Sequence, residues 1–234
     1  MKKRIWIVAI SVFVLLISGC ERWDIDKITE PGVSRELADL RHNTISNLNY
    51  DLSFEIPGNA EEDIPAVITI AFDFNSVGKY PFLLDFKEKP EMVHSLELNE
   101  DSCDYLFENE HIIIPSSLLK RGRNSIRIAF SAGKQSLNRR DNFMYTLLVP
   151  DRARTLFPCF DQPDLKASYI LTLSVPDKWK AVANSPLNKS VTNADNQTVT
   201  YSFHPTEPLS TYLFSFVAGE FEKAGKSDNL GRTL

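Results

Sequence analysis

The feature that most constrains the fold of this 234-residue chain is a strict alternation of apolar and polar residues in short runs. In residues 47–56 every second side chain is apolar, and the apolar set is Leu48, Tyr50, Leu52, Phe54 and Ile56. Successive side chains of a β-strand point to opposite faces, so the pattern predicts a strand with one buried and one solvated face. No segment carries a long pattern with the 3.6-residue period of a helix.

The same two-residue period recurs in four further runs. Their apolar positions are Ile68, Ile70, Phe72 and Phe74; Ile126, Ile128 and Phe130; Tyr169, Leu171, Leu173 and Val175; and Val199, Tyr201 and Phe203. Turn-forming segments such as 57–59 and 193–196 separate the runs. Because parallel sheets need helical crossovers and none is predicted, we expect an all-β fold of two packed antiparallel sheets, a β-sandwich.

The first twenty residues have the pattern of an export signal. A basic start is followed by an apolar run, residues 5–17, which is shorter than the ~20 residues that span a bilayer. The small residues that end in Cys20 resemble a bacterial lipoprotein signal, in which Cys20 becomes the lipid-bearing N-terminus. We favour this interpretation over an uncleaved anchor or a secreted form without lipid.

Four segments are predicted on this basis. Residues 1–19 form the lipoprotein signal peptide, and residues 20–44 form a polar tether with a short helix near 35–41. Residues 45–222 form the β-sandwich, and residues 223–234 begin a missing linker or catalytic domain.

The motifs of common hydrolytic sites are absent from the sequence. There is no H-E-x-x-H zinc motif, no G-x-S-x-G elbow and no glycine-rich phosphate loop. The four histidines lie far apart, and His111, in a strand-like His-Ile-Ile-Ile-Pro segment, is better explained as a strand-end residue than as a metal ligand. We therefore predict no catalytic and no metal-binding residue in this chain.

Some remaining residues have two interpretations each. Asp161 and Asp164 flank a proline turn, where capping of backbone N–H groups is a better explanation than paired acid–base catalysis. The aromatic stretch 212–216 fits a sandwich core better than a ligand-stacking face. Cys103 and Cys159 could pair in an oxidising compartment, but nothing in the sequence brings them together, and we favour unpaired thiols.

Residues 143–186 carry a specific resemblance. Tyr145-Thr146, Ala153-Arg154 and above all the run Phe157-Pro158-Cys159-Phe160-Asp161-Gln162-Pro163-Asp164-Leu165-Lys166-Ala167 closely resemble the signature of the aminopeptidase N family of zinc peptidases, peptidase family M1. Segments 179–186 and 208–219 are similar to the strands that follow it, and the likeness covers roughly residues 45–222. The resemblance implies an N-terminal β-sandwich that packs against a thermolysin-like catalytic domain and roofs its active site.

The resemblance also implies which functional residues this chain contains. The family's zinc ligands, general-base Glu and G-x-M-E-N segment lie downstream of this domain, so zinc belongs to the complete enzyme and this chain is predicted to be inactive alone. One sandwich residue, a Gln that accepts a hydrogen bond from the substrate's α-ammonium, is Leu147 here. Leu148 and Val149 stand where an aromatic and a Glu are usual, so the substrate-binding role of Leu147 is in doubt.

Two functions follow from these observations. We favour the non-catalytic N-terminal portion of a membrane-anchored zinc aminopeptidase, whose complete form releases N-terminal amino acids from peptides. The alternative is a stand-alone β-sandwich lipoprotein that binds a partner or peptide without catalysis.

Three kinds of partner are expected: the missing catalytic domain, in the same or a separate chain, peptides, and a membrane of the bacterial cell envelope. The protein would face the periplasm or the exterior. A net charge of -5, with scattered Lys and Arg, argues against nucleic acid.

Overall fold

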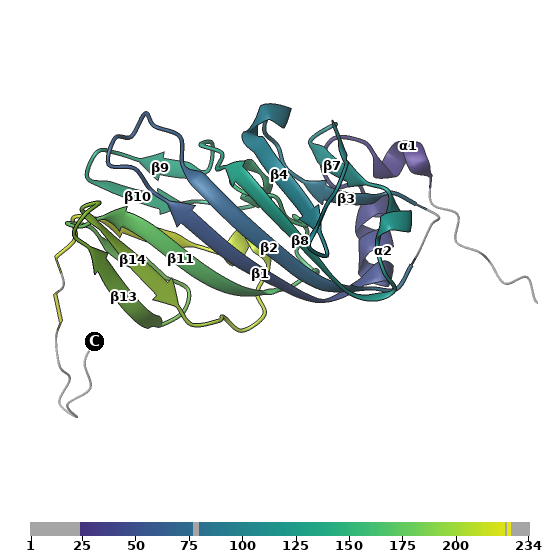
Figure 1. Ribbon diagram of the computed structural model, residues 1–234. Helices are drawn as coiled ribbons and strands as arrows, with labels where there is room; N and C mark the ends of the chain where they lie inside the picture. The colour runs from purple at the N-terminus through teal and green to yellow at the C-terminus, as the bar shows by residue number, and fades with distance from the viewer. Residues whose placement is uncertain (1–23, 77–79, 223, 226–234) are drawn as a thin grey trace, which may run out of the picture.

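The structure, a computed structural model, describes residues 24–76, 80–222 and 224–225. These residues form a β-sandwich whose one layer is a large sheet and whose other layer is two smaller sheets (Figure 1). The large sheet has the strand order β13 (Leu187–Asn193), β14 (Thr198–Phe203), β11 (Ser168–Pro176), β1 (Ile45–Glu55), β2 (Pro65–Phe74), β8 (Gly122–Ser131), β4 (Val93–Leu98) and β5 (Asp101–Ser102). The four-stranded sheet has the order β12 (Lys180–Ala183), β15 (Phe216–Gly219), β10 (Phe143–Thr146) and β9 (Leu137–Arg139). The three-stranded sheet has the order β3 (Phe82–Asp85), β7 (His111–Ile114) and β6 (Leu106–Glu108).

The five alternating runs of the sequence are strands with buried apolar faces, as predicted, and the structure places all five side by side in the large sheet. They are the neighbouring strands β14, β11, β1, β2 and β8, and their apolar side chains are buried. Both small sheets pack on this buried face. The Phe72 ring of β2 stacks on Phe82 of β3 at 5.0 Å, and the Phe54 ring of β1 lies 5.4 Å from Phe216 of β15.

One strand pair corrects the expectation of purely antiparallel sheets. β1 and β11 pair in parallel, with Asn49 opposite Ser168 and Glu55 opposite Ser174. A parallel pair needs a long crossover, and here residues 56–167 provide it. That crossover builds the three-stranded sheet, β9 and β10 of the four-stranded sheet and part of the large sheet, so strands rather than a helix return the chain to lie beside β1.

Short strands account for what the alternation did not predict. All four residues of β3 are buried, because one face meets the large sheet and the other meets the N-terminal helices. A strand that is covered on both faces shows no apolar–polar alternation. The opposite case is β13, where all seven residues are exposed at the sheet edge.

Two helices precede the sandwich, α1 (Ile25–Ile28) and α2 (Arg35–Thr44). The Ser34 hydroxyl accepts a hydrogen bond from the Leu37 N–H at 3.0 Å and caps α2. Ile28, Leu37 and Leu40 form a buried cluster with Leu83 of β3. The segment expected to be a polar tether therefore packs on the sandwich from Ile28 onward, and the predicted signal peptide lies outside the described residues.

Short 3-10 turns complete the described structure. They are η1 (Pro90–Met92), η2 (Ser116–Leu118), η3 (Ala153–Thr155) and η4 (Thr211–Leu213). The turn at η2 is followed by Gly122, whose φ of 91° lies in the left-handed region that favours glycine. In the part of the chain that the structure describes, no helix has the length and hydrophobicity to cross a membrane.

Candidate functional site

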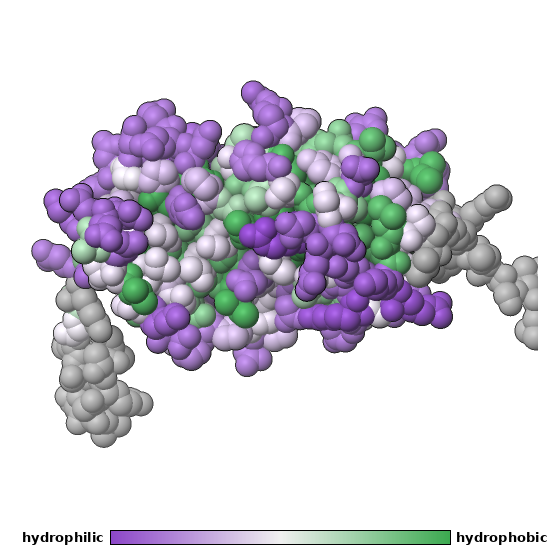
Figure 2. Space-filling view, in the orientation of Figure 1, coloured by the Kyte–Doolittle hydropathy of each residue, from purple (hydrophilic) through white to green (hydrophobic). Residues whose placement is uncertain are grey.

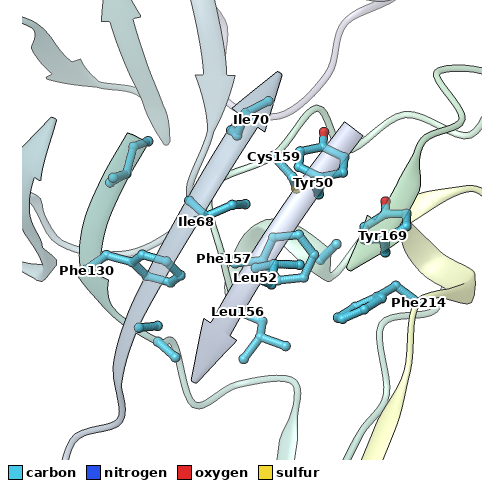
Figure 3. Close-up of a cluster of buried hydrophobic side chains, with 14 of the residues drawn as sticks. Tyr50, Leu52, Ile68, Ile70, Phe130, Leu156, Phe157, Cys159, Tyr169 and Phe214 are labelled. Carbon is cyan, nitrogen blue, oxygen red and sulfur yellow. The ribbon is translucent and has the colours of Figure 1, made fainter. Parts of the chain in front are cut away.

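The first half of the signature run, residues 157–162, is buried between the two layers, whereas Pro163, Asp164 and Lys166 are exposed. Phe157, Cys159 and Phe160 are fully buried, and Figure 3 shows Phe157 and Cys159 among the side chains of Tyr50, Tyr169 and Phe214. The Phe160 N–H donates to the Tyr50 hydroxyl at 2.9 Å, which ties the run to β1. Strand β1 and the signature run thus fix each other's position.

A buried polar cluster joins this run to α2, β3 and β7. The Arg41 guanidinium donates to both carboxylate oxygens of Asp85, at 2.6 and 2.8 Å, and His111 Nδ1 lies 3.0 Å from Asp85 Oδ1. The Asp161 N–H also donates to Asp85 Oδ2 at 2.8 Å. Burial alone raises the pKa of Asp85, but Arg41 and His111 outweigh it and lower that pKa to about 2.

Asp161 and Asp164 are not paired as acid–base catalysts would be. Asp161 accepts from the Thr211 hydroxyl at 2.7 Å and from the Arg154 N–H at 3.1 Å, so it caps backbone as expected and ties η4 to the signature run. Burial raises the pKa of Asp161, and the two donors oppose that effect. Asp164 lies on the surface, 3.1 Å from the Nδ1 of His42, and accepts from the Gln162 side-chain amide at 3.1 Å. These partners are side chains, and not the backbone N–H groups that were expected.

Leu147 lies at an exposed strand end. Along β10 and the residues after it, Met144, Thr146 and Leu148 point inward, while Tyr145 and Leu147 point outward with 41% and 49% of their surfaces exposed. The Leu147 N–H donates to the carbonyl of Ser136 at 2.9 Å.

Ser136 also fixes the chain that follows Leu147. Its side chain is buried, bonds to the Thr155 hydroxyl and donates to the Arg152 carbonyl. Because Arg152 N–H in turn donates to the Leu148 carbonyl, the segment after β10 is held at both ends. Leu147 is thus presented to solvent on a rigid support.

The outward face of the four-stranded sheet continues from Leu147. The strand registers place Tyr145 of β10 opposite Val217 of β15, and Val217 opposite Val182 of β12. Val182 is 59% exposed, and Leu213 beside β15 is 50% exposed. We call these five residues, Tyr145, Leu147, Val182, Leu213 and Val217, the bare face.

The histidines do not converge on a metal site. His111 Nε2 lies 2.9 Å from the Glu30 carbonyl, and His94 Nε2 lies 2.9 Å from the Ser131 hydroxyl. Among residues 24–76, 80–222 and 224–225, no three His, Cys, Asp or Glu side chains are grouped as a metal ion would require. These side chains therefore do not fit a zinc site.

The structure also shows the state of the two cysteines and the burial of the aromatic stretch 212–216. Cys103 and Cys159 are both free thiols, as favoured, and burial raises the pKa of each. Phe214 and Phe216 are buried in the core, which agrees with the core interpretation of residues 212–216. Cys20, the predicted lipid attachment site, lies outside the described residues.

Sequence reasoning missed the Arg41–Asp85–His111 cluster. Asp85 ends the apolar run Phe82-Leu83-Leu84, where a charge is unusual, and this was the available signal. Its partners lie 44 residues before and 26 residues after it, so no local pattern connects them.

Comparison with known proteins identifies relatives of this chain. The family described as Peptidase M1 N-terminal domain matches residues 86–213. Aminopeptidase N of Streptomyces lividans is 30% identical over 220 residues, a match that covers 85% of this chain and 24% of that protein. Glutamyl aminopeptidase of Homo sapiens is 36% identical over 85 residues, or 36% of this chain and 9% of that protein.

Solved structures share the fold at low identity. An M1 zinc metallopeptidase from Deinococcus radiodurans aligns with a TM-score of 0.61 and 18% identity, covering 75% of this chain and 42% of that one. A mutant of a two-domain M1 zinc metallopeptidase bound to L-arginine aligns with a TM-score of 0.65 and 18% identity, over 79% of this chain and 44% of that one. The chain thus spans about a quarter of the bacterial aminopeptidase and less than half of the solved chains.

Proposed function

Because this chain belongs to the family of peptidase M1 N-terminal domains, we propose that it is the non-catalytic N-terminal portion of a zinc aminopeptidase. The match to residues 86–213, which include the buried signature run and Leu147, is the observation that carries the proposal. The chain supports peptide hydrolysis by presenting one wall of the site. The catalytic groups belong to a further portion of the protein.

Zinc in this proposal is held by residues outside the chain. The relatives include structures described as M1 zinc metallopeptidases, whereas the His, Cys, Asp and Glu side chains described here do not form a metal-binding group. A zinc ion would polarise the scissile carbonyl and activate water in the catalytic portion. The residues of this chain would hold the peptide in place and exclude water from one side of the site. None of them is assigned a proton-transfer step.

The substrates in this proposal are peptides with a free N-terminus, and Leu147 faces them. Its exposed alkyl side chain accepts no hydrogen bond. A buried substrate ammonium that faces it therefore lacks one partner, at a cost of about 1–3 kcal/mol. The complete enzyme must then obtain its acceptors for the ammonium from the catalytic portion.

The proposed location is the bacterial cell envelope, with a lipid on Cys20 as the anchor. The support for this is the basic and then apolar leader that ends in Gly19-Cys20. Replacing Cys20 with Ala should release the protein from the membrane fraction, because a lipid chain contributes most of the membrane affinity. Quantitative membrane attachment of the Cys20→Ala protein would contradict the anchor.

Two experiments test the function. The nucleotide sequence beyond the codon for Leu234 should encode G-x-M-E-N and H-E-x-x-H. The purified chain should release no amino acid from a chromogenic aminoacyl amide and bind no stoichiometric zinc, and mixing it with the catalytic portion as a separate chain should restore cleavage. Zinc-dependent cleavage by the chain alone, or a stop codon followed by unrelated sequence, would contradict the proposal.

A further inference from the structure

An apolar row crosses the outer face of the three-stranded sheet, and its exposure changes along the row. The strand registers place Leu106 of β6 opposite Ile113 of β7, and Ile113 opposite Leu83 of β3. Leu83 is 2% exposed because the N-terminal helices cover it, whereas Leu106 is 67% exposed. The helices therefore cover the β3 end of the row and leave the β6 end open.

Ile25 extends the open end of this row onto α1. It lies three residues before Ile28, so both side chains lie on the same side of the short helix. Ile113 packs against the buried cluster that Ile28 forms with Leu83, and Ile25 is 51% exposed. We call Ile25, Leu106 and Ile113 the N-terminal patch. Figure 2 shows hydrophobic residues at the end of the molecule where Figure 1 places α1 and β7.

The N-terminal patch is held in shape by contacts between the end of α1 and the sheet. The side chain of Asn109, between β6 and β7, donates to the Thr29 carbonyl at 3.0 Å. His111 Nε2 of β7 lies 2.9 Å from the Glu30 carbonyl. Because α1 is already fixed on the sheet that carries Leu106, the patch loses little conformational entropy when it meets another surface.

We propose that the N-terminal patch rests on the lipid bilayer to which Cys20 anchors the chain. The inference rests on the proposed lipid anchor and adds to it which side of the domain faces the membrane. Residues 21–24 separate Cys20 from Ile25, and an extended chain over this distance spans at most about 18 Å. A compact domain of about 200 residues has a radius of gyration of about 16 Å, so this tether keeps the α1 end near the lipid headgroups.

The charges around the patch indicate which kind of bilayer it fits. The exposed basic side chains of the two helices, Lys27 and Arg35, are paired with Glu36 and Asp39. The exposed acidic residues of α1, the loop after it and β6 are Asp24, Asp26, Glu30 and Glu108. Because anionic lipids repel carboxylates, the attraction must come from the apolar side chains, which enter the boundary between headgroups and acyl chains. The patch therefore fits a surface of zwitterionic lipids.

The test is hydroxyl-radical labelling of the full chain with its lipid on Cys20, bound to vesicles of phosphatidylethanolamine and phosphatidylcholine. The reference is the lipid-free chain from residue 21 onward, which contains every described residue. Ile25 and Leu106 should lose labelling by about threefold or more on the vesicles, because lipid excludes water from them. Val182 and Val191, 59% and 56% exposed on the other two sheets, should label equally in both samples. Equal labelling of Ile25 and Leu106 in both samples would overturn the inference.

Leu106→Glu separates contact with the bilayer from mere nearness to it. The side chain is 67% exposed, so the substitution should leave the fold intact, and the lipid should keep the variant attached. On the vesicles, Ile25 should regain at least about half of the labelling seen without lipid, because the new carboxylate stays in water. Val191→Glu is the matched control and should leave Ile25 protected. Full protection of Ile25 in the Leu106→Glu chain would overturn the contact.

Failure of the anchor and failure of the inference give different results. If the wild-type chain carries no lipid and does not attach to membranes, the proposed anchor fails and the inference fails with it. If the chain attaches but Ile25 and Leu106 stay fully labelled, only the inference fails. If the catalytic portion protects Ile25 and Leu106 in the absence of vesicles, that portion is the occupant, which also overturns the inference.

Discussion

The three-stranded sheet and the four-stranded sheet pack on the same face of the large sheet. Within the described residues, only the first has helices over part of its outer face, and there Leu106 of the edge strand β6 is still 67% exposed. Leu83 of β3 is 2% exposed beneath the N-terminal helices, whereas Val182 of β12 is 59% exposed. The covered sheet also contains Asp85 and His111 of the buried polar cluster. The difference teaches that the covered sheet contributes to stability and that the bare one is available for contact.

The largest loss of stability is expected from Phe160→Ala, on the covered side. Its ring packs at 5.5 Å from the Phe82 ring and lies 5.2 Å from the Arg41 guanidinium carbon. Removing a fully buried phenylalanine ring should cost about 3–5 kcal/mol of unfolding free energy in urea titrations. Phe221→Ala, at a 40% exposed ring, is the control and should cost less than about 1 kcal/mol. Equal losses would show that Phe160 is misplaced.

Arg41→Ala should cost nearly as much. The substitution leaves the Asp85 carboxylate buried without its bidentate partner, a situation that costs about 3–5 kcal/mol. Arg35→Ala, on the same helix but exposed, should change stability by less than about 0.5 kcal/mol. An Arg41→Ala protein as stable as the Arg35→Ala protein would contradict the role of the cluster in fastening α2.

A matched leucine pair compares the two sheets directly. Leu83→Ala should destabilise the chain by about 2–5 kcal/mol, because it opens a cavity under the N-terminal helices. Leu213→Ala, at a side chain that is 50% exposed on the bare face, should cost less than about 1 kcal/mol in the isolated chain. If Leu213→Ala is the more damaging of the two, the assignment of stability and contact to the two sheets is reversed.

The covered side should also determine the response to acid. The folded-state pKa of Asp85 is lowered from 3.8 to about 2, so its contribution is complete above pH 4 and is lost as the pH falls toward 2. This loss should be about 2 kcal/mol of unfolding free energy. Asp161, whose pKa burial raises, acts in the opposite direction, and its contribution is lost as the pH rises.

Comparison with Arg41→Ala isolates the Asp85 effect. Between pH 6 and pH 2.5, the wild type should lose about 2 kcal/mol more unfolding free energy than the variant, because Arg41 lowers the pKa of Asp85. Parallel pH profiles for the two proteins would show that the ion pair does not determine acid sensitivity.

On the bare side, the smallest effect on stability is expected from Leu147→Gln. The stability of the chain should change by less than about 0.5 kcal/mol, because the side chain is half exposed. In the enzyme reconstituted with its catalytic portion, the new acceptor should stabilise the transition state of free-amine substrates by up to about 1–3 kcal/mol. The kcat/KM for these substrates should rise accordingly. An unchanged kcat/KM would refute the substrate-facing role of Leu147 and leave the assignment of the chain to the non-catalytic portion intact.

The sequence predicts the parts of this fold that depend on local pattern. The alternating runs identified β1, β2, β8, β11 and β14, and the signature run identified the family. The alternation missed β3 because both faces of that strand are buried. It also missed the parallel pairing of β1 with β11, because the neighbour and the direction of a strand depend on the path of the long chain segment between the two strands. Periodicity shows that a strand has two unlike faces but does not show which strand lies beside it.

The candidate site was predictable only in part for the same reason. Leu147 was singled out through the resemblance, but the bare face joins it with Val182, Leu213 and Val217 from segments far along the chain. Likewise, the Arg41–Asp85–His111 cluster joins α2, β3 and β7. Contacts between distant segments are set by tertiary packing, which propensity and spacing do not encode.

The most direct test of the account is hydroxyl-radical labelling of the full chain with and without its catalytic portion, read residue by residue by mass spectrometry. Tyr145, Leu147, Val182 and Leu213 are exposed in the free chain and should lose labelling by several-fold in the complex, because in the proposed function the catalytic portion meets the side of the sandwich that presents Leu147 and excludes solvent there. Ile170 and Val191, exposed on the large sheet, should label equally in both states. Protection of Ile170 and Val191 with unchanged labelling of the bare face would contradict the account.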